Sequence, residues 1–536
     1  MTRRTGLAFL AALLAAVLHT WPLASDPVGL SRHDNADTTL TTWIVSWVAH
    51  ALPRDPLQVF DAPIFHPERR TLAYSEPLLV PGAMAIPLVA AGLDATAIYN
   101  VLVILGFALS AWAMWRVLAH WTGDEAAGAV AGLAYAFNAH LLTRFGHLQA
   151  IHAECLPIVL FAIDRLAARG RLRDGVLLGV GLALVGLTSI YQLAFAAGAT
   201  VAGMLVRVPE WRKRSTATSV ATGLGVGLGV LFLAPMLWQY LTVSREWGLA
   251  RTVADAAAFG ASWRDYLATG GRLHYGWWSA PFFNDTAALF PGVTVTLLAL
   301  VGLTAPREQQ GRVRMMAAIG VTGVLMSLGP EVPFYTWLFE HVPLLQAIRA
   351  TDRWGMLALT ALAVLAGYGL SVLRARLGTR PRLALTAGAI ALITIEALRA
   401  PLAFTPTPVI PPIYQRIAAI PGAVLLEFPT YGGPEFSHNA PYMLAQTTHF
   451  KPIVAGYSGF FTPGYTERLA ELATFPSEVS RRRLEAIGVT HIVLHLEPLR
   501  AAVGQAAIDR IDQVPWVTRE FEDATARVYR VRRDAP

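Results

Sequence analysis

The sequence has little charge, almost no lysine and a single cysteine. Of its 536 residues, only 15% are charged and 54% are hydrophobic, and the mean hydropathy is +0.45. Soluble domains carry about 25% charged residues, so this composition argues against a soluble enzyme and predicts an integral membrane protein. The one cysteine, Cys155, excludes an intramolecular disulfide and a cysteine-based metal site.

The cations are almost all arginines, because Lys213 and Lys451 are the two lysines. A net charge of +7 and a pI of about 9.6 are compatible with nucleic-acid binding. However, the arginines fall in short clusters between apolar runs, which is typical of cytoplasmic loops in membrane proteins. We therefore expect contact with membrane lipids and no nucleic-acid partner.

Eleven apolar runs predict transmembrane helices, because every backbone group inside lipid must be hydrogen-bonded. The first run is long enough to favour a membrane helix over a cleaved signal peptide. The runs cover residues 6–24, 98–118, 126–138, 151–166, 175–190, 192–206, 216–240, 288–305, 313–329, 353–373 and 383–400.

Four arginine-rich loops predict the orientation of these helices. Short loops rich in arginine favour the cytoplasmic side, so eleven spans place the N-terminus inside and the C-terminus outside. A twelfth apolar run, 76–92, would reverse this arrangement, but Pro81 and Pro87 interrupt it. We expect that run to form a re-entrant or interfacial helix on the outer side. The four loops cover residues 165–173, 207–214, 307–314 and 374–382.

The sequence divides into a transmembrane domain, residues 1–400, and an extracytoplasmic domain, residues 401–536. Within the first outer loop, 25–97, apolar residues of the segment 38–52 recur at three- and four-residue steps, which predicts an amphipathic helix lying on the membrane surface. The second domain shows strand patterns in GAVLLEFP and VTHIVLHL and a closing hairpin in WVTREF and ARVYRV. The predicted fold is an all-α polytopic membrane domain with juxtamembrane outer helices and a small α/β domain.

Two aspartates, Asp34 and Asp37, follow the first apolar run on the predicted outer side. Nucleotide sugars and ATP are absent there, so a group donor must arrive attached to a lipid such as a polyprenyl phosphate. A carboxylate can then act as a general base on an acceptor hydroxyl. The spacing would place both carboxylates on one helix face; alternatively, Asp37 is the N-cap of a helix starting at Thr38.

Further outward polar residues are candidates for substrate binding, and each has a structural alternative. Glu76 could contact a sugar or an acceptor, or favour a helix N-terminus. His147 could hydrogen-bond the substrate, or be an ordinary interfacial histidine. Arg349 and Arg353 could hold the donor phosphate, or belong to a structural ion pair. The full set of binding candidates is Glu76, His147, Arg349, Arg353, Asp352, His66 and Arg144.

His66 belongs to the segment HPERR (66–70), whose basic pair either contacts lipid headgroups or is an ordinary loop pair. No HExxH spacing supports a zinc site around His147. The sequence requires no cofactor, and it leaves open a divalent metal beside the two aspartates.

The layout resembles the GT-C superfamily of integral-membrane glycosyltransferases, which includes protein O-mannosyltransferases and the aminoarabinose transferase of lipid A. The resemblance implies a catalytic aspartate in the first outer loop, matched here by Asp34 or Asp37. It also implies a surface helix that starts with an acid and a proline before the second span, matched by Glu76 and residues 77–79.

The sequence is also similar to a group of bacterial multi-pass membrane proteins. The shared segments are DxxD (34–37), DPLxxFDAPIFHPExxTLAYSEPLL (55–79), AYAFNAHLLTRFGHLQ (134–149), IRATDRW (348–354) and GYSGFFTPGY (456–465). This likeness implies location in the cytoplasmic (inner) membrane of a bacterium.

Taken together, these features predict a glycosyltransferase. It would move a sugar from a polyprenyl-phosphate-linked donor to an envelope lipid, glycan or protein on the outer face of the membrane. A transporter or flippase of an envelope lipid is an alternative, although it predicts charges at helix centres and broken helices. A non-catalytic envelope assembly protein is a third hypothesis.

Overall fold

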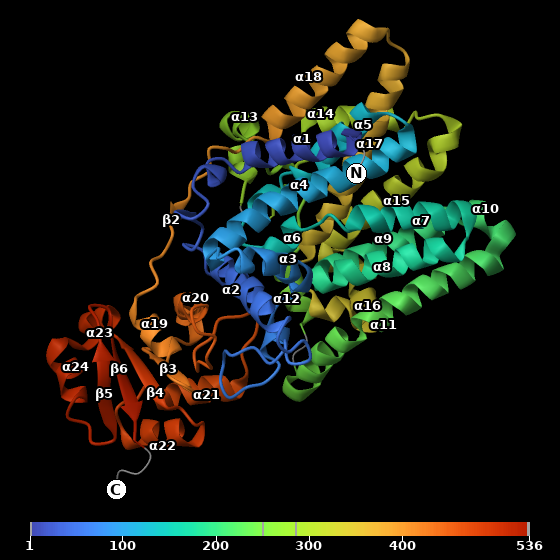
Figure 1. Ribbon diagram of the computed structural model, residues 1–536. Coiled ribbons are helices and arrows are strands. Elements are labelled where there is room, and N and C mark those ends of the chain that lie inside the picture. Colours follow the sequence, from blue (N-terminus) through green and yellow to red (C-terminus); the bar gives the residue numbers. More distant parts are fainter. Residues whose placement is uncertain (1–2, 249–250, 285–286, 533–536) are drawn as a thin grey trace. The chain divides into compact units, whose positions relative to one another are not determined.

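The computed structural model describes residues 3–248, 251–284 and 287–532 (Figure 1). The chain forms two compact units. The helical unit comprises residues 1–27, 100–238 and 249–404, and the mixed unit comprises residues 28–99, 239–248 and 405–536. The first outer loop therefore folds in the same unit as the C-terminal segment, far away in the sequence.

Each of the eleven predicted runs contains a helix. By length and composition, three stretches in the described residues are suited to crossing a membrane: Ala95–Thr122, Val208–Trp247 and Thr351–Ala375. The apolar helices are those of a membrane protein, and the count of eleven spans stays a prediction. The helices are α1 (Arg3–His19), α4 (Ala95–Thr122), α5 (Glu125–Ala136), α7 (Leu156–Arg169), α8 (Leu172–Thr188), α9 (Ile190–Val206), α11 (Ser215–Trp247), α14 (Val293–Gly302), α15 (Gln310–Ser327), α17 (Gly355–Ala375) and α18 (Thr379–Ala397).

Helix α17 forms the core of the helical unit, where it packs against α5, α14 and α15 (Figure 1). Nearly all of its side chains from Gly355 to Leu370 are buried. A side chain at Gly369 would collide with the carbonyl oxygen of Leu298 in α14. Glycine at this position therefore allows the two backbones to approach closely, as in many membrane helix pairs.

Ion pairs join three of the arginine-rich loops. Asp164, near the end of α7, contacts Arg207 at the end of α9, with 2.6 Å between Oδ1 and Nη1. The other carboxylate oxygen of Asp164 lies 3.0 Å from Nε of Arg312, at the start of α15. The loops that follow α7 and α9 and the loop that precedes α15 therefore lie together.

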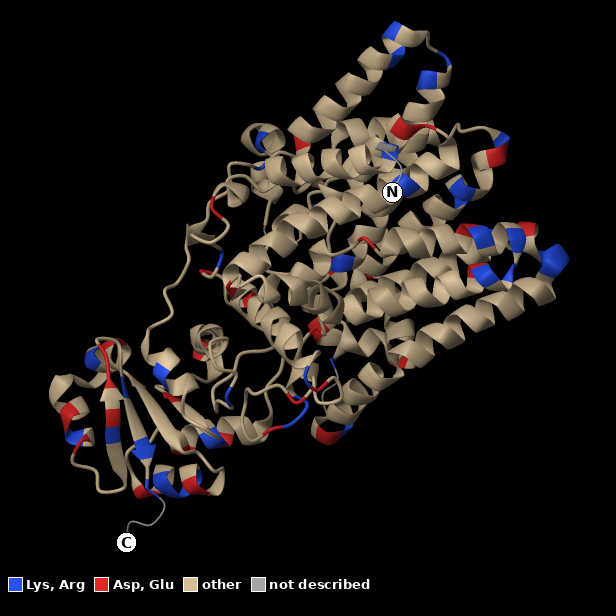
Figure 2. Cartoon of the chain, in the orientation of Figure 1, with Lys and Arg blue, Asp and Glu red and all other residues tan. Residues whose placement is uncertain are grey.

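The fourth loop joins them through the turn between α4 and α5. Arg312 donates a hydrogen bond to the carbonyl oxygen of Trp121 over 3.3 Å. Arg374, at the end of α17, lies 2.8 Å from the carboxylate of Asp124 in the same turn. All four loops thus meet at one end of the helical unit, which we call the arginine end. Figure 2 shows basic residues, drawn in blue, at several helix ends. The prediction that the four loops lie on one side of a membrane requires them to be at the same end of the helices.

One face of α1 remains uncovered by protein. Leu7, Leu10, Leu14 and Leu18 are exposed and recur at three- and four-residue steps. A continuous exposed apolar stripe on a helix is expected where lipid replaces protein as the neighbour. The first predicted run therefore has the surface of a membrane helix.

In the mixed unit, α2 (Ala36–Ala51) packs against α3 (Leu79–Ala90) and α20 (Ala440–Gln446). The predicted helix is confirmed, but the prediction that only one of its faces is apolar and buried is wrong, because residues 38–46 are all buried. Its location at the membrane surface stays a prediction. Three of its hydroxyl groups form hydrogen bonds with the helix backbone. Thr41, Thr42 and Ser46 donate to the carbonyl oxygens four residues earlier, over 2.7 to 2.9 Å. Residues that count as polar in the sequence can therefore be buried.

Backbone bonds fasten the first outer loop to the C-terminal segment inside this unit. The amide of His66 donates to the carbonyl of Ile453, and the amide of Ile453 donates to the carbonyl of Pro63, each over 3.0 Å. The indole of Trp43 in α2 donates to the side chain of Gln446 over 2.7 Å. These contacts explain why segments so distant in sequence form one unit.

The predicted α/β part is confirmed. A four-stranded sheet has the order β3-β4-β6-β5, with β3 and β4 parallel and the other pairs antiparallel. Helix α22 (Glu478–Ala486) ends just before Gly488, whose φ of +74° suits glycine. The strands are β3 (Leu425–Phe428), β4 (His491–His495), β5 (Val517–Glu522) and β6 (Ala526–Val531), and a separate pair joins β1 (Leu30–Ser31) to β2 (Thr405–Pro406).

Candidate functional site

The two predicted catalytic aspartates flank the start of α2, with Asp34 before the helix and Asp37 in its first turn. The side-chain oxygen of Asn35 accepts hydrogen bonds from the amides of Asp37 and Thr38, over 2.9 and 3.2 Å. Asn35 is thus the N-cap, and the alternative in which Asp37 caps the helix is wrong. Because Asp34 precedes the cap, the prediction that both carboxylates share one helix face is wrong as well. Asparagine caps as well as aspartate does, so sequence alone did not separate them.

Asp37 is held in place from a distant part of the same unit. It lies in the first turn of α2, is half-buried, and accepts a hydrogen bond from the hydroxyl of Tyr457 over 2.8 Å. The positive end of the helix dipole also favours a carboxylate there. Asp34 is exposed, and Nε of Arg32 lies 3.4 Å from its carboxylate. An exposed pair of this kind contributes little, so Asp37 is the better-organised carboxylate of the two.

Two other candidates lie in the mixed unit. The ring of His66 hydrogen-bonds the carbonyl oxygen of Ile487 over 2.8 Å, which ties the first loop to the end of α22. Burial lowers the pKa of His66, although this carbonyl acts in the opposite direction. Glu76 is half-buried just ahead of α3, and its neighbour Ser75 accepts a bond from Tyr240 over 2.6 Å. Substrate binding by His66 and Glu76 stays a prediction.

A buried histidine precedes the two aspartates. The ring nitrogens of His33 lie 3.0 Å from the hydroxyl of Thr39 and 3.1 Å from that of Thr96. Burial lowers the pKa of His33 to about 4, while Asp34 and Asp94 act in the opposite direction. His33 is therefore neutral at pH 7 and acts as a hydrogen-bonding spacer beside the start of α2.

Acidification is expected to destabilise the protein through His33. An unfolded histidine binds a proton near pH 6.5 and folded His33 only near pH 4, so between these values the unfolded state binds more protons. The stability contribution is complete above pH 6.5 and is lost as the pH falls to 4, by up to about 3 kcal/mol. Melting temperatures in detergent at pH 7.0, 5.5 and 4.5 measure this effect. His33→Gln should reduce the fall of the melting temperature between pH 7.0 and 4.5, whereas His438→Gln, at an exposed position, should not. An equal fall of the melting temperature in both variants would contradict the role given to His33.

In the helical unit, four predicted residues and Arg251, which was not predicted, gather into a basic cluster with His147 beside it. The basic cluster is defined as Arg144, Arg251, Arg349, Arg353 and Asp352. The guanidinium of Arg144 lies 3.2 Å from the carboxylate of Asp352, and both side chains are buried. Arg353 lies over the ring of Tyr191, 4.6 Å from its centroid. The hydroxyl of Tyr191 in turn accepts bonds from the amides of Arg349 and Ala350.

The basic cluster lies at the opposite end of the helical unit from the arginine end. Helix α5 starts beside Asp124 at the arginine end, and the segment that carries Arg144 follows its other end. Helix α17 ends with Arg374 at the arginine end, and residues 349–353 precede its start. The basic cluster and the arginine end therefore lie at opposite ends of α5 and α17.

Positive charge exceeds negative charge in the basic cluster. Burial, followed by repulsion from Arg353, lowers the pKa of Arg144 to about 10, and Asp352 opposes this shift, so Arg144 stays charged. Burial and the neighbouring arginines also hold the pKa of His147 well below its usual value, so this ring is neutral. Asp352, Asp255 near Arg251 and Asp265 near Asp352 together do not balance four arginines. The cluster therefore favours an anion.

A small cavity of about 30 Å³ adjoins this cluster. Arg353, Gln149 and Gln192 line it together with His140 and Tyr191. Within the residues that the structure describes, Nε of Arg353 and the side-chain oxygens of Gln149 and Gln192 are buried without a hydrogen-bond partner. Buried polar atoms are normally paired with protein, water or a ligand, so this cavity is suited to a polar group.

Breaking the buried pair of Arg144 and Asp352 is expected to destabilise the fold. Asp352→Leu should lower the free energy of unfolding by about 3–5 kcal/mol, because Arg144 would remain buried without its carboxylate. The double variant Arg144→Met/Asp352→Leu should recover most of this loss. Unfolding followed by circular dichroism in detergent measures both. Glu478→Leu, which breaks surface pairs with Arg481 and Arg482, should cost less than about 1 kcal/mol. A double variant as unstable as Asp352→Leu would contradict the prediction.

Comparison with solved structures identifies the fold. The chain aligns with the arabinofuranosyltransferase AftD from Mycobacteria at a TM-score of 0.61 and 16% identity, covering 100% of this chain and 40% of AftD. A structure of an AftD mutant gives a TM-score of 0.55 at 16% identity, covering 100% of this chain and 42% of that one. The chain has a GT-C fold. The resemblance inferred from the sequence is thereby confirmed at the level of fold, and the chain spans less than half of AftD.

ArnT from Cupriavidus metallidurans, bound to undecaprenyl phosphate, aligns over 100% of both chains at a TM-score of 0.49 and 12% identity. No protein-family model and no curated protein matches the sequence.

The predicted site residues are divided between the two compact units. Sequence reasoning missed Arg251, Tyr457, Tyr191 and His140, although Tyr457 and His140 lie in the quoted segments GYSGFFTPGY and AYAFNAHLLTRFGHLQ. In the described ranges, no three His, Cys, Asp or Glu side chains are grouped to hold a metal ion. The mixed unit holds Asp34, Asp37, His66 and Glu76, and the helical unit holds Arg144, His147, Arg349, Asp352 and Arg353.

Proposed function

We propose that this protein is a glycosyltransferase that moves a sugar from a polyprenyl-phosphate-linked donor to a hydroxyl or amine of an envelope lipid, glycan or protein. The GT-C fold, shared with an enzyme named for arabinofuranosyl transfer, supports this class of reaction. The observation that carries the proposal is the carboxylate of Asp37 in the first outer loop, held by Tyr457 over 2.8 Å. This is the place where the family resemblance implies a catalytic aspartate.

The proposed reaction is a single displacement. Asp37 takes the proton of the acceptor hydroxyl while that oxygen bonds to the anomeric carbon of the donor sugar. The bond between this carbon and the phosphate oxygen breaks on the opposite face, and the electron pair leaves with the lipid phosphate. The configuration at the anomeric carbon is therefore inverted. Asp34 assists by orienting the acceptor.

The basic cluster supplies the ligands for the phosphate in this proposal. Arg349 and Arg353 can offer guanidinium N–H groups to phosphate oxygens, a geometry that suits bidentate recognition. His147 is neutral and can donate one further hydrogen bond. Arg144 contributes charge while it remains paired with Asp352. The excess of positive charge compensates the negative charge that grows on the leaving phosphate.

The proposed mechanism is compatible with a divalent cation beside the two aspartates. Magnesium is commonly held by one or two carboxylates together with substrate phosphates. Asp34 and Asp37 are the residues that would hold such an ion, and it would orient the acceptor hydroxyl beside them. A chelator in the transfer assay tests this requirement directly.

The proposed location is the cytoplasmic membrane of a bacterium, with the N-terminus in the cytoplasm and the basic cluster and the C-terminal segment outside. The arginine end supports this orientation, because positively charged short loops favour the cytoplasmic side. A lipid-linked donor is then the form of activated sugar available to the outward cluster.

The test of the proposed function is sugar transfer by the purified full-length protein in liposomes. Radiolabelled polyprenyl-phosphate sugars are supplied singly, with an envelope extract as acceptor, with and without a chelator. Label is expected to move from the lipid to the acceptor fraction for at least one donor. Absence of transfer with every donor, by protein that is folded according to its melting curve, would refute the proposal.

Removal of the tyrosine hydroxyl beside Asp37 is expected to slow transfer. Hydrogen bonds to charged groups contribute about 1.5–3 kcal/mol, so Tyr457→Phe should lower kcat by about 10- to 100-fold with little change in the KM of the donor. In the background of Asp37→Asn, the same change should have no further effect, because Tyr457 acts through that carboxylate. Tyr431→Phe is the control in the same unit. Additive effects of Tyr457→Phe and Asp37→Asn would contradict a positioning role.

A further inference from the structure

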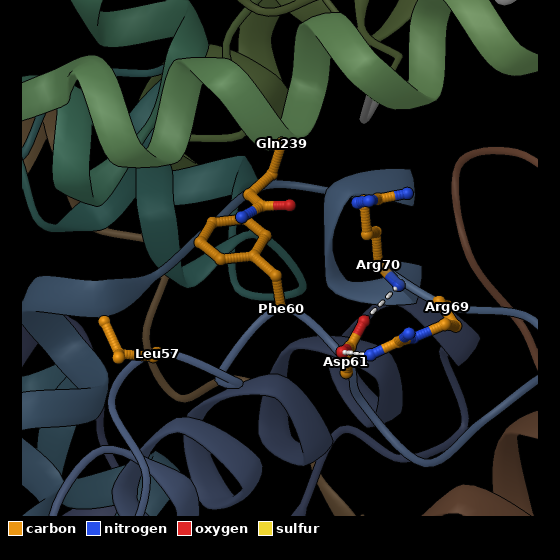
Figure 3. A pocket seen from close by; sticks show the side chains of 6 residues that line it. All are labelled: Leu57, Phe60, Asp61, Arg69, Arg70 and Gln239. Carbon is orange, nitrogen blue, oxygen red and sulfur yellow. Dashed lines mark hydrogen bonds and ion pairs between the residues drawn. The ribbon is translucent and has the colours of Figure 1, made fainter.

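A second cavity, of about 140 Å³, lies within the mixed unit (Figure 3). The first outer loop contributes most of its wall, and Gln239 of α11 contributes the rest. This is the unit that holds Asp37. The lining residues are Leu57, Phe60, Asp61, Arg69, Arg70 and Gln239.

Asp61 organises one side of the cavity. One carboxylate oxygen accepts the amide of Arg70 over 2.9 Å, and the other accepts the guanidinium of Arg69 over 3.0 Å (Figure 3). Arg70 has a φ of +57°, which is uncommon for a residue with a side chain. Such a conformation persists where neighbouring contacts enforce it and is frequent at ligand sites. The bond from Arg70 to Asp61 is one such contact.

The charges around this cavity cancel. Arg69 is paired with Asp61, and Arg70 is paired with Glu246 at 3.0 Å. A free phosphate or a lipid phosphate would therefore meet no net positive charge, in contrast to the basic cluster. The paired groups still offer guanidinium N–H donors and carboxylate acceptors side by side. Sugar hydroxyls, which donate and accept at once, match such a surface.

The remaining wall suits a sugar ring. Phe60 is fixed by an edge-to-face contact with Tyr240, with 6.1 Å between ring centroids. Phe60 is itself buried, so the exposed side chain of Leu57 contributes most of the small apolar part of the lining. The amide of Gln239 makes no hydrogen bond with the part of the chain that the structure describes, so its donor and acceptor are available. The cavity thus combines a mainly polar lining, a free amide and a neutral ion-pair edge, with a small apolar edge at Leu57.

We propose that this cavity is a subsite for one uncharged sugar residue of a glycan acceptor. This inference rests on the proposed function and deepens it, because it selects glycans among the possible acceptors. Its volume suits one ring rather than a chain, so the rest of the glycan would extend into solvent. The subsite would raise the affinity for the acceptor without touching the donor.

Direct binding tests the subsite independently of transfer. Fluorescently labelled uncharged arabinan, mannan and glucan tetrasaccharides and, separately, inorganic phosphate are added to the purified full-length protein in detergent. At least one oligosaccharide is expected to bind, and phosphate at millimolar concentration should not displace it. Arg69→Ala should weaken this binding at least fivefold. Failure of all three oligosaccharides to bind, or displacement by phosphate, would overturn the proposal.

Arg482→Ala is the matched control for Arg69→Ala. Both side chains are strongly exposed, 78% and 76%, and each is paired with one carboxylate of the same unit. The control should bind the oligosaccharide as the wild type does; an equal loss in both variants would overturn the site. Gln239→Ala, which removes no charge, should also weaken binding. Asp37→Asn should lower the rate of transfer by about 100-fold or more and leave oligosaccharide binding intact, so failure of the subsite and failure of the proposed catalysis give different results.

Discussion

Replacement of Asp37 by asparagine is expected to lower kcat for sugar transfer by about 10²- to 10⁴-fold, the usual contribution of a general base. The amide keeps the size of the side chain and can still meet the hydroxyl of Tyr457, but it cannot take the proton of the acceptor. The KM of the lipid-linked donor should change little, because the donor phosphate is assigned to the basic cluster. Initial rates in liposomes with radiolabelled donor measure both constants.

Asp55→Asn is the matched control for Asp37→Asn. Asp55 is exposed in the same loop, and the substitution removes the same charge. Its rate should equal that of the wild type. The kcat of Asp34→Asn should lie between those of Asp37→Asn and Asp55→Asn, because Asp34 is proposed only to orient the acceptor. A variant Asp37→Asn that retains more than a tenth of the wild-type kcat would remove Asp37 from the proposed mechanism, and a larger loss in Asp34→Asn would transfer the role of base to Asp34.

Replacement of Arg353 by glutamine is expected to raise the KM of the donor by about 10- to 100-fold, because hydrogen bonds to charged groups contribute about 1.5–3 kcal/mol. The side chain lies over Tyr191 and lines the small cavity, where its Nε has no partner among the described residues. A phosphate oxygen would supply that partner. Binding of radiolabelled donor to the protein in nanodiscs measures the effect without turnover.

Two further variants sharpen this test. Arg264→Gln removes the same charge from an exposed arginine that lies over Trp263 in the same unit, and donor binding should be unchanged. Arg353→Lys should recover only part of the affinity, because an ammonium lacks the planar fork of donors. Equal donor affinity in Arg353→Gln and the wild type would show that the basic cluster is structural.

Local features of the sequence predicted the helices and strands well. Long apolar runs place a helix wherever lipid leaves the backbone no other hydrogen-bond partner, and each of the eleven runs contains one. The hairpin of β5 and β6 was equally readable, because alternating residues flank a short polar turn. In α2, the sequence pattern wrongly predicted a polar face, because the hydroxyls of Thr41 and Thr42 are hydrogen-bonded to the helix backbone and are buried.

The sequence predicted only part of the candidate site. The sequence indicated Asp34 and Asp37 as a pair, but their spacing could not show that Asn35 caps the helix and leaves Asp34 outside it. It indicated Arg353 and Asp352, yet it did not reveal that the carboxylate pairs with Arg144, which is 208 positions away. Contacts between distant segments leave no periodic signal in a single sequence.

The sequence by itself determined that this is a helical membrane protein, which ends of its helices carry the arginines, and that it ends in a small α/β segment. These properties depend on composition and on local periodicity, which each segment carries independently. Only the tertiary structure decided that the first outer loop folds with the C-terminal segment, that Tyr457 holds Asp37, and that the arginines near residues 144 and 353 form one cluster. These features arise from packing between distant segments, where shape, burial and hydrogen-bond partners are fixed jointly by the whole fold.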